Sequence, residues 1–410
     1  MERFVRQKKG KAVMKKTNSS VRWLYLAVGT AALLFAGVIY AWSILKAPLA
    51  AEFGWSASAL SLNFTLTMCC FCLGGMLGGV LNRRLGLRTA CIISAVLSAA
   101  GFLIASGMGE SIGVLYFSYG FMAGLGIGIA YNCIISTVNA WFPDKKGLAS
   151  GVMMMGFGAS ALVIGSAADA LIASPSLGWR SAYRVIGIAL GLVLVLAALI
   201  LKKAPEAEPV RKNDPEAEST DLTTAQMLKT VTFWKGMLIL IFLAAVGNTV
   251  ISMAKDLALS VGLAAGAATT LVGILSVCNG LGRVITGAVF DRFGRRTTMI
   301  SANIMTICAA GITLLSILTG SAALGVAGLC LTGLSYGTCP TISSAFTSEV
   351  FGTRYFPMNF AVMNCNLIPA SFIATGASLI NAASGGYAAS FILLLTLSVL
   401  ALLLNLSIRK

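Results

Sequence analysis

Twelve apolar stretches, each long enough to cross a lipid bilayer as a helix, follow one another along this chain. A bilayer core about 30 Å thick needs about 20 helical residues, and lipid cannot hydrogen-bond a backbone left open. The stretches lie near 23–45, 58–81, 89–107, 112–138, 148–172, 182–201, 236–254, 267–290, 297–318, 322–346, 357–382 and 387–408. The sequence therefore predicts an all-α membrane protein with twelve transmembrane helices, surrounded by lipid.

The composition fits lipid as the solvent. Of the 410 residues, 57% are hydrophobic and 11% are charged, whereas a soluble domain carries roughly 25% charged residues. The net charge of +16 resides in tails and short loops, a pattern of membrane orientation that argues against a nucleic-acid partner. The ten cysteines all lie in apolar stretches without the spacing of a metal site, so we interpret them as packing residues.

Lysine and arginine predict the orientation in the membrane. If the N-terminus lies in the cytoplasm, the inner tails and loops hold 25 of the 30 basic residues. The outer side holds four, and Arg283 stands alone inside a helix. Because basic residues are retained on the cytoplasmic side, both termini are expected there, in a chain of the cell or plasma membrane.

The chain divides at a polar segment near its middle. Residues 202–222 are rich in charge and proline and predict a flexible linker. Thr223 and Gln226 have capping-box spacing, and a short surface helix with Met227, Leu228, Phe233 and Trp234 is expected to follow. The predicted parts are a basic tail (1–22), a first six-helix half (23–201), the linker (202–235) and a second half (236–410).

An internal repeat supports the two halves. Residues 79–88 read GVLNRRLGLR, and residues 287–296, which lie 208 positions later, read GAVFDRFGRR. The segments around Phe142 and Phe351, and around Gly178 and Gly386, recur at nearly the same offset. The sequence therefore predicts two parallel six-helix halves joined by the linker.

These motifs resemble those of the major facilitator superfamily. GAVFDRFGRR fits that superfamily's signature between helices eight and nine at every position, whereas the first copy has Arg83 where an acid is expected. The resemblance implies a cytoplasmic latch at Asp291 and its neighbouring arginines. We expect gating roles for Asp291, Arg292, Arg295 and Arg88 at this end, and for Lys255 and Asp256 at the outer end.

A finer resemblance covers nearly the whole chain. YAWSI at 40–44, EFGWS at 52–56, WFPDKKGLASG at 141–151 and NGLGRVITG at 279–287 are similar to segments of the oxalate/formate antiporter group and the monocarboxylate transporters. This resemblance implies that the substrate is a small organic anion.

Arg283 is the residue that most constrains the chemistry. It lies eight positions before Asp291, so it stands about 12 Å along the helix from the cytoplasmic mouth. An arginine at that depth costs at least about 2.5–3.5 kcal/mol without compensation. We interpret it as an anchor for a carboxylate, which a guanidinium binds with two parallel hydrogen bonds; a structural pairing is the alternative.

Asn279, one turn earlier on the same face, is expected to orient the guanidinium or bind the substrate. In the resembling monocarboxylate transporters an acid often occupies this place, so an obvious proton site is missing here. Other residues are expected near mid-depth around the same cavity, with interhelical packing as the alternative. They are Tyr40, Tyr131, Asn132, Phe157, Tyr336, Cys365 and Asn366.

The number of cations separates two substrates. Oxalate carriers of the resembling group use a second cation, a lysine in helix eleven, and no lysine or arginine lies between Arg354 and Arg409. We therefore expect a transporter of monocarboxylates such as lactate, pyruvate or formate, by proton symport or anion exchange. A dicarboxylate antiporter and a non-transporting membrane sensor are the alternatives. No enzyme, metal or cofactor is expected, and the chain is expected to act as a monomer.

Overall fold

The computed structural model describes residues 19–204 and 221–408, and every regular element in these ranges is a helix. The elements are α2 (Ser19–Ala36), the 3₁₀ segment η1 (Gly37–Ala41), α3 (Trp42–Phe53), α4 (Ala57–Ser106), α5 (Ile112–Leu115), the π-helical segment η2 (Tyr116–Ala123), α6 (Gly124–Asn139), α7 (Lys146–Ala173), α8 (Gly178–Ile200), α9 (Thr224–Leu228), α10 (Val231–Ser260), α11 (Ala265–Thr319), α12 (Ala322–Phe351), α13 (Phe356–Asn364), α14 (Leu367–Ser384) and α15 (Ala388–Leu406). The prediction of an all-α membrane protein is confirmed.

Two of these elements cross the membrane twice. Helix α4 has 50 residues and α11 has 55, so straight helices would be about 75 Å and about 83 Å long, more than twice the bilayer core. Each instead turns back at a glycine with positive φ, at Gly86 (φ 83°) and Gly294 (φ 75°). Glycine adopts this conformation without a steric penalty. The ten membrane-length segments in the described ranges therefore make twelve crossings.

The backbone repeats at the same offset as the sequence. The turn glycines Gly86 and Gly294 are 208 positions apart. Gly54 and Gly262, which follow the first outer helix end of each half, also have positive φ and are also 208 positions apart. The predicted duplication is therefore visible in the turns themselves.

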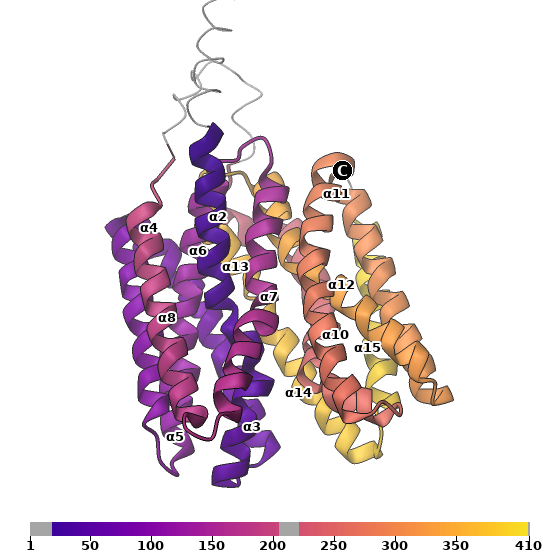
Figure 1. Ribbon diagram of the computed structural model, residues 1–410. Coiled ribbons are helices and arrows are strands. Elements are labelled where there is room, and N and C mark those ends of the chain that lie inside the picture. The colour runs from indigo at the N-terminus through magenta and orange to yellow at the C-terminus, as the bar shows by residue number, and fades with distance from the viewer. Residues whose placement is uncertain (1–18, 205–220, 409–410) are drawn as a thin grey trace, which may run out of the picture.

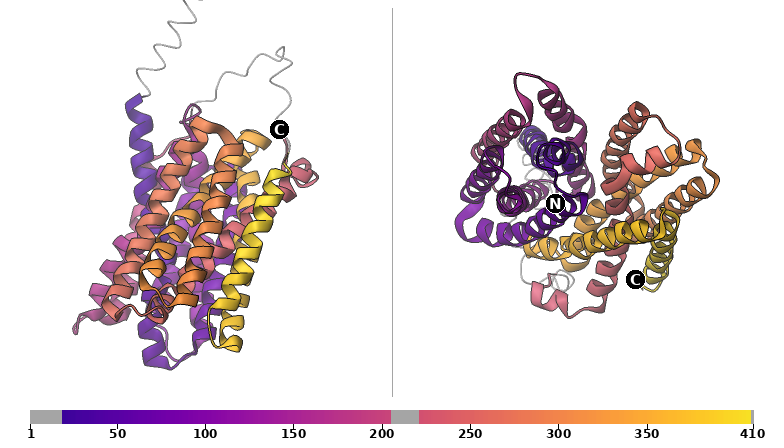
Figure 2. Two further views of the ribbon diagram at one scale, coloured as in Figure 1. Left: turned by 90° about the vertical axis from the view of Figure 1, so that its right-hand side faces the viewer. Right: turned by 90° about the horizontal axis from the view of Figure 1, so that it is seen from below.

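The helices form two bundles. Elements α2 to α8 make one and α10 to α15 the other (Figure 1), and the view from below shows them side by side (Figure 2). This confirms the two predicted six-helix halves. Residues 1–18 and 205–220 lie outside the described residues, so the precise boundaries of tail, halves and linker stay predictions.

The described end of the linker is attached to the second half. Thr223 and Gln226 form the predicted capping box at the start of α9, with a Thr223 N to Gln226 Oε1 distance of 2.9 Å. Just before it, Asp221 Oδ1 accepts hydrogen bonds from the backbone N–H groups of Thr353 and Arg354. Phe233 and Trp234 belong to α10 rather than to the short surface helix.

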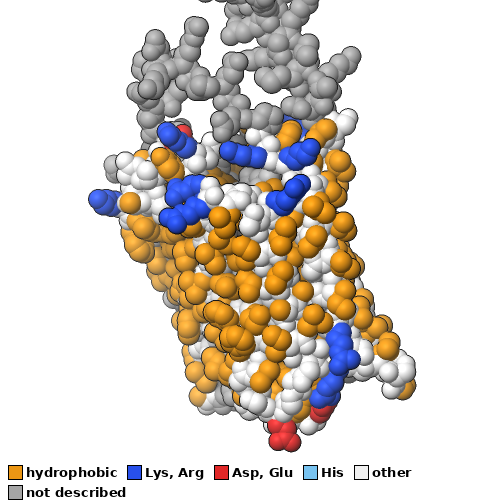
Figure 3. Space-filling model, turned by 90° about the vertical axis from the view of Figure 1, so that its left-hand side faces the viewer, with side chains coloured by type: hydrophobic (Ala, Val, Ile, Leu, Met, Phe, Trp, Pro, Cys, Tyr) orange, Lys and Arg blue, Asp and Glu red, His pale blue; other side chains and the backbone are white. Residues whose placement is uncertain are grey.

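The surface has the pattern of a membrane protein. Figure 3 shows a broad apolar belt, with lysine and arginine side chains concentrated at the end that carries the N-terminus. Outward-facing leucines occur in both halves, for example Leu192 of α8 at 60% exposure and Leu403 of α15 at 58% exposure. Such exposure suits lipid rather than water.

The orientation can be tested at two exposed positions at opposite ends, Lys229 and Glu110. If both termini are cytoplasmic, a membrane-impermeant maleimide added to intact cells labels Glu110→Cys and leaves Lys229→Cys unlabelled until the membrane is permeabilised. The wild-type chain, with its ten cysteines in apolar stretches, gives the background. The reverse labelling pattern would contradict the orientation inferred from the basic residues.

Candidate functional site

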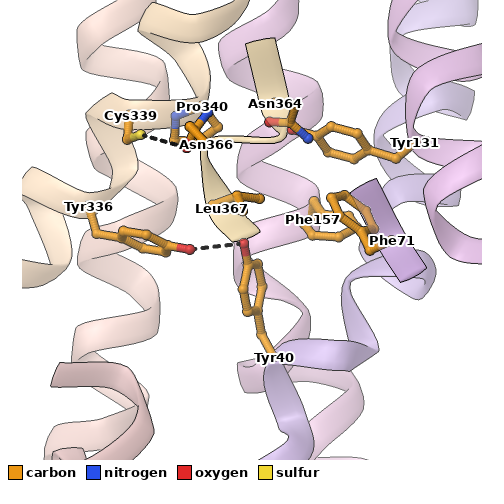
Figure 4. Close-up of a pocket in the computed structure, with 10 residues that line it drawn as sticks. All are labelled: Tyr40, Phe71, Tyr131, Phe157, Tyr336, Cys339, Pro340, Asn364, Asn366 and Leu367. Atoms are coloured by element: carbon orange, nitrogen blue, oxygen red, sulfur yellow. Dashed lines mark hydrogen bonds between the residues drawn. The ribbon is translucent and has the colours of Figure 1, made fainter. Parts of the chain in front are cut away.

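A small cavity lies at the centre of the molecule, between the two halves (Figure 4). The centre of a water molecule can occupy about 10 Å³ of it, so the cavity has room for roughly one water. The lining comes from both halves and is mainly aromatic: Tyr40, Phe71, Tyr131, Phe157, Tyr336, Cys339, Pro340, Asn364, Asn366 and Leu367. The structure thus brings five of the predicted binding residues together: Tyr40, Tyr131, Phe157, Tyr336 and Asn366.

Two irregular backbone segments border the cavity. Tyr40 lies in η1, which interrupts the first crossing, and the eleventh crossing breaks between α13 and α14 at Cys365 and Asn366. Pro369 follows this break and lacks the N–H that would continue the helix. Asn366 Nδ2 instead donates to the carbonyl of Met363 at 2.8 Å. Broken backbone at membrane depth is tolerated where it lines a cavity or is buried in protein.

Arg283 lies beside this cavity, at the boundary of the halves. Its side chain is 1% exposed. Nε donates to Asn279 Oδ1 at 3.2 Å, and Nη1 donates to the carbonyl of Met154, in the other half, at 2.6 Å. The guanidinium carbon is 5.8 Å from the ring centre of Tyr40. Nη2 is buried and has no hydrogen-bond partner among the described residues.

This arrangement leaves part of a buried charge uncompensated. The side chains that line the cavity include no aspartate or glutamate, and the two partners of the guanidinium are neutral oxygen atoms. A buried charge without a counter-charge is strongly unfavourable, and an unused charged donor adds to that cost. The guanidinium can therefore gain an anionic partner at Nη2.

Gly158 of α7 provides the space for this side chain. A Cβ at this position would lie 3.1 Å from both Cζ and Nε of Arg283. The distance is shorter than ordinary contacts, and the bond from Nε to Asn279 limits how far the guanidinium can shift. The absence of a side chain at residue 158 therefore determines where the charge can sit.

The tyrosine hydroxyls join the halves near the same place. Tyr40 and Tyr336 have their hydroxyl oxygens 3.4 Å apart, and Tyr336 donates to Asn248 Oδ1 at 2.8 Å. Asn248 was not among the predicted residues, although a signal for it exists in the sequence. It lies 208 positions after Tyr40, so the two are equivalent in the repeat. Both contact Tyr336.

Two predicted binding residues point elsewhere. Asn132 Nδ2 donates to the carbonyl of Pro357 at 2.9 Å, which joins the halves away from the cavity. Cys365 Sγ lies 3.4 Å from the carbonyl of Ala361 and is not part of the cavity lining. Their depth was expected from the sequence, but the side of the helix on which they lie was not.

The end that carries the N-terminus is closed by hydrogen bonds between the halves. Asp291 accepts from the backbone N–H groups of Gly147 at 3.2 Å and Leu148 at 3.0 Å. These residues begin α7, so the carboxylate also faces the positive end of a helix dipole. Nearby, the hydroxyls of Ser150 and Ser344 are 3.0 Å apart.

The arginines expected beside Asp291 have other neighbours. Arg295 is 3.9 Å from Glu349, and Arg292 lies over the ring of Phe293 at 5.2 Å. Arg88 is exposed at the corresponding turn of the first half. Asp291 is therefore bonded to backbone donors of the other half in place of the arginine side chains that the motif suggested, and its gating role stays a prediction.

At the opposite end, Asp256 interacts electrostatically with Lys46 of the first half. The side chain of Lys255, the expected partner of Asp256, lies outside the described part of the structure. A gating role for Lys255 and Asp256 stays a prediction. Lys46 was not among the predicted gating residues, and its position near Asp256 adds it to this prediction.

Comparisons with known proteins agree with this architecture. Residues 26–368 match the family model described as Major Facilitator Superfamily. The chain is 27% identical to the oxalate:formate antiporter of Oxalobacter formigenes over 91% of its own length and 88% of that protein. It is 24% identical to monocarboxylate transporter 12 of Rattus norvegicus over 84% of this chain and 75% of that protein.

Solved structures share the fold. The proton:xylose symporter XylE superposes with a TM-score of 0.78 and 16% sequence identity, covering 94% of this chain and 95% of that chain. The transporter FucP, in the outward conformation, superposes with a TM-score of 0.71 and 14% identity, covering 95% and 100%.

The space at Gly158 can be tested by stability. Gly158→Ala places a methyl group against the guanidinium of Arg283, and overpacking of this kind costs about 1–3 kcal/mol. We expect a lower thermal unfolding midpoint in detergent. The matched control is Gly311→Ala in α11, where a Cβ meets nothing within 4 Å. Equal midpoints for the two variants would contradict the packing described here.

Proposed function

The chain belongs to the Major Facilitator Superfamily and is a multi-pass membrane transporter of a small solute, not an enzyme; on that premise we propose that it carries small organic anions, foremost monocarboxylates, across the plasma membrane. Lactate, pyruvate and formate are the expected type of substrate. The coupling is proton symport or anion exchange, which an imposed pH gradient distinguishes.

One observation carries the proposal. Arg283 Nη2 is a buried, positively charged donor without a partner among the described residues. A carboxylate offers the charge and the acceptor geometry that a guanidinium matches. The neighbouring rings of Tyr40, Phe157 and Tyr131 suit the short apolar part of a small organic acid.

Transport requires the cavity to enlarge. The cavity has room for roughly one water, so it does not accommodate a carboxylate in this conformation. In the proposed cycle the halves rock about this centre, with the Asp291 contacts closing one end and the opposite charges of Lys46 and Asp256 acting at the other. In the proposed orientation, the conformation described here is closed toward the cytoplasm.

The charge of the site favours one carboxylate over two. The cavity lining contains no lysine or arginine, so Arg283 is the cation beside it among the described residues. A second carboxylate on the substrate would have no cation opposite it. A cation at 4 Å would have contributed about 4 kcal/mol of attraction at an effective dielectric of about 20, and water in the cavity reduces this loss. The alternative is dicarboxylate exchange, which the similarity to an oxalate:formate antiporter supports.

Substitution of Arg283 tests the anchor. Arg283→Gln should abolish uptake of a labelled monocarboxylate in proteoliposomes, because a charge-assisted hydrogen bond worth about 1.5–3 kcal/mol is lost. Arg283→Lys should restore little, because lysine lacks the planar fork. Both variants should still insert into the membrane, as measured by expression and elution volume. Uptake by Arg283→Gln near the wild-type level would contradict the role of Arg283 as the anchor.

Competition tests the number of charges. Monocarboxylates such as lactate, pyruvate and formate should each compete better than oxalate and malonate against a labelled monocarboxylate in reconstituted vesicles. Asn366→Lys, which adds a cation to the cavity lining, should shift the preference toward the dianions. If oxalate competes at least about tenfold better than every monocarboxylate, a second cation reaches the site and dicarboxylate exchange is the better account.

A further inference from the structure

A series of hydrogen bonds leads from the cavity into the second half. The hydroxyl oxygens of Tyr40 and Tyr336 are 3.4 Å apart, and Tyr336 is 2.8 Å from Asn248 Oδ1. Asn248 Nδ2 is 3.3 Å from Ser371 Oγ, which is 2.8 Å from the carbonyl oxygen of Leu367. These groups connect the first crossing with three elements of the second half, α12, α10 and α14.

The carbonyl at the end of the series gives its protons one consistent direction. A carbonyl oxygen only accepts, so Ser371 donates its single hydroxyl proton to Leu367. Ser371 Oγ then accepts from the amide nitrogen of Asn248, and this fixes the orientation of that amide. Its oxygen faces Tyr336 and accepts the one proton that the Tyr336 hydroxyl carries.

Burial keeps this orientation in place. Tyr336 is 2% exposed, Asn248 4% and Ser371 3%, so bulk water offers them no alternative partners. If the Asn248 amide were reversed, Tyr336 would lose its acceptor at 2.8 Å and would have to donate to Tyr40 across 3.4 Å, while Ser371 would have to turn its proton away from Leu367. Buried polar groups of this kind are costly to leave unpaired.

The consequence lies at the cavity. Tyr336 has no proton left, so its oxygen presents only acceptor capacity to Tyr40 or to a ligand. The Tyr40–Tyr336 distance of 3.4 Å exceeds that of an ordinary hydroxyl–hydroxyl bond, so the Tyr40 proton is the one most easily redirected. A bound carboxylate can accept the hydrogen bond from the Tyr40 hydroxyl. The Tyr336 oxygen then no longer receives a hydrogen bond from Tyr40.

We propose that Asn248 acts through Tyr336 to make the cavity prefer carboxylates that carry a hydroxyl group on the adjacent carbon. The carboxylate would bind Arg283 Nη2 and the Tyr40 hydroxyl, and the substrate hydroxyl would donate to Tyr336. The same acid without the hydroxyl, or with an oxo group in its place, leaves the Tyr336 oxygen unpaired. The inference rests on the proposed carboxylate transport. Asn248 does not touch the substrate and is a positioning residue.

The test measures preference as well as activity. Inhibition constants for lactate, propionate and pyruvate are determined against a labelled monocarboxylate in proteoliposomes of the full chain. The wild type should bind lactate about tenfold better than propionate or pyruvate, the contribution of about one neutral hydrogen bond.

Two variants should change this preference in different ways. Asn248→Leu, close in shape to asparagine but apolar, releases the Tyr336 proton, so pyruvate, whose oxo group can accept it, should bind more tightly, while propionate and lactate change little. Tyr336→Phe removes the acceptor, so lactate should weaken to the level of propionate. The control is Tyr119→Phe, because Tyr119 is buried away from the cavity with a hydroxyl that has no partner among the described residues.

The outcomes separate this inference from the function on which it depends. If no carboxylate competes, the proposed function fails and the inference fails with it. If carboxylates compete but lactate has no advantage in the wild type, or Asn248→Leu leaves the ratio of lactate to pyruvate unchanged, only the role of Asn248 is overturned. A purely structural role would weaken all three acids together and preserve their ratio, which would also overturn it.

Discussion

The fold depends on how a charge is kept in the low-dielectric centre of a membrane protein. Arg283 is almost fully buried and bonds to Asn279 in its own helix and to a backbone carbonyl of the other half. An uncompensated charge at this depth costs several kcal/mol, so its surroundings must supply space, oxygen atoms and aromatic faces. Gly158 and Tyr40 provide the space and the aromatic face. Met154, Gly158 and Tyr40 belong to the first half, so their contacts with Arg283 also hold the two halves together.

The duplicated halves have unequal roles. The position 208 residues before Arg283 is Gly75, and the position equivalent to Asp291 is Arg83. The second half therefore carries both the central cation and the acid of the latch, whereas the first half supplies a helix N-terminus and most of the aromatic lining. In the proposed cycle, similar backbones with different chemistry let the two halves move as equivalent bodies around a site that is polarised toward one of them.

Much of the architecture could be predicted from the sequence, because lipid makes helix length and charge placement strong signals. The twelve crossings, the duplication and the cap at Thr223 follow from such signals. Depth was predictable for Arg283 and Tyr336, but the facing direction was not, since a helix that is apolar on all sides has no periodicity to orient it. For that reason the sequence did not indicate that Asn132 and Cys365 lie outside the lining of the cavity. The partner of Arg283 at Met154 is a carbonyl, which every residue possesses, so no pattern marks it.

The central claim is that the buried guanidinium binds the transported anion. A structure determined with a bound monocarboxylate tests it most directly. The account predicts a carboxylate oxygen within hydrogen-bonding distance of Arg283 Nη2, beside the hydroxyls of Tyr40 and Tyr336. A carboxylate bound elsewhere, with the guanidinium still held only by Asn279 and Met154, would contradict it.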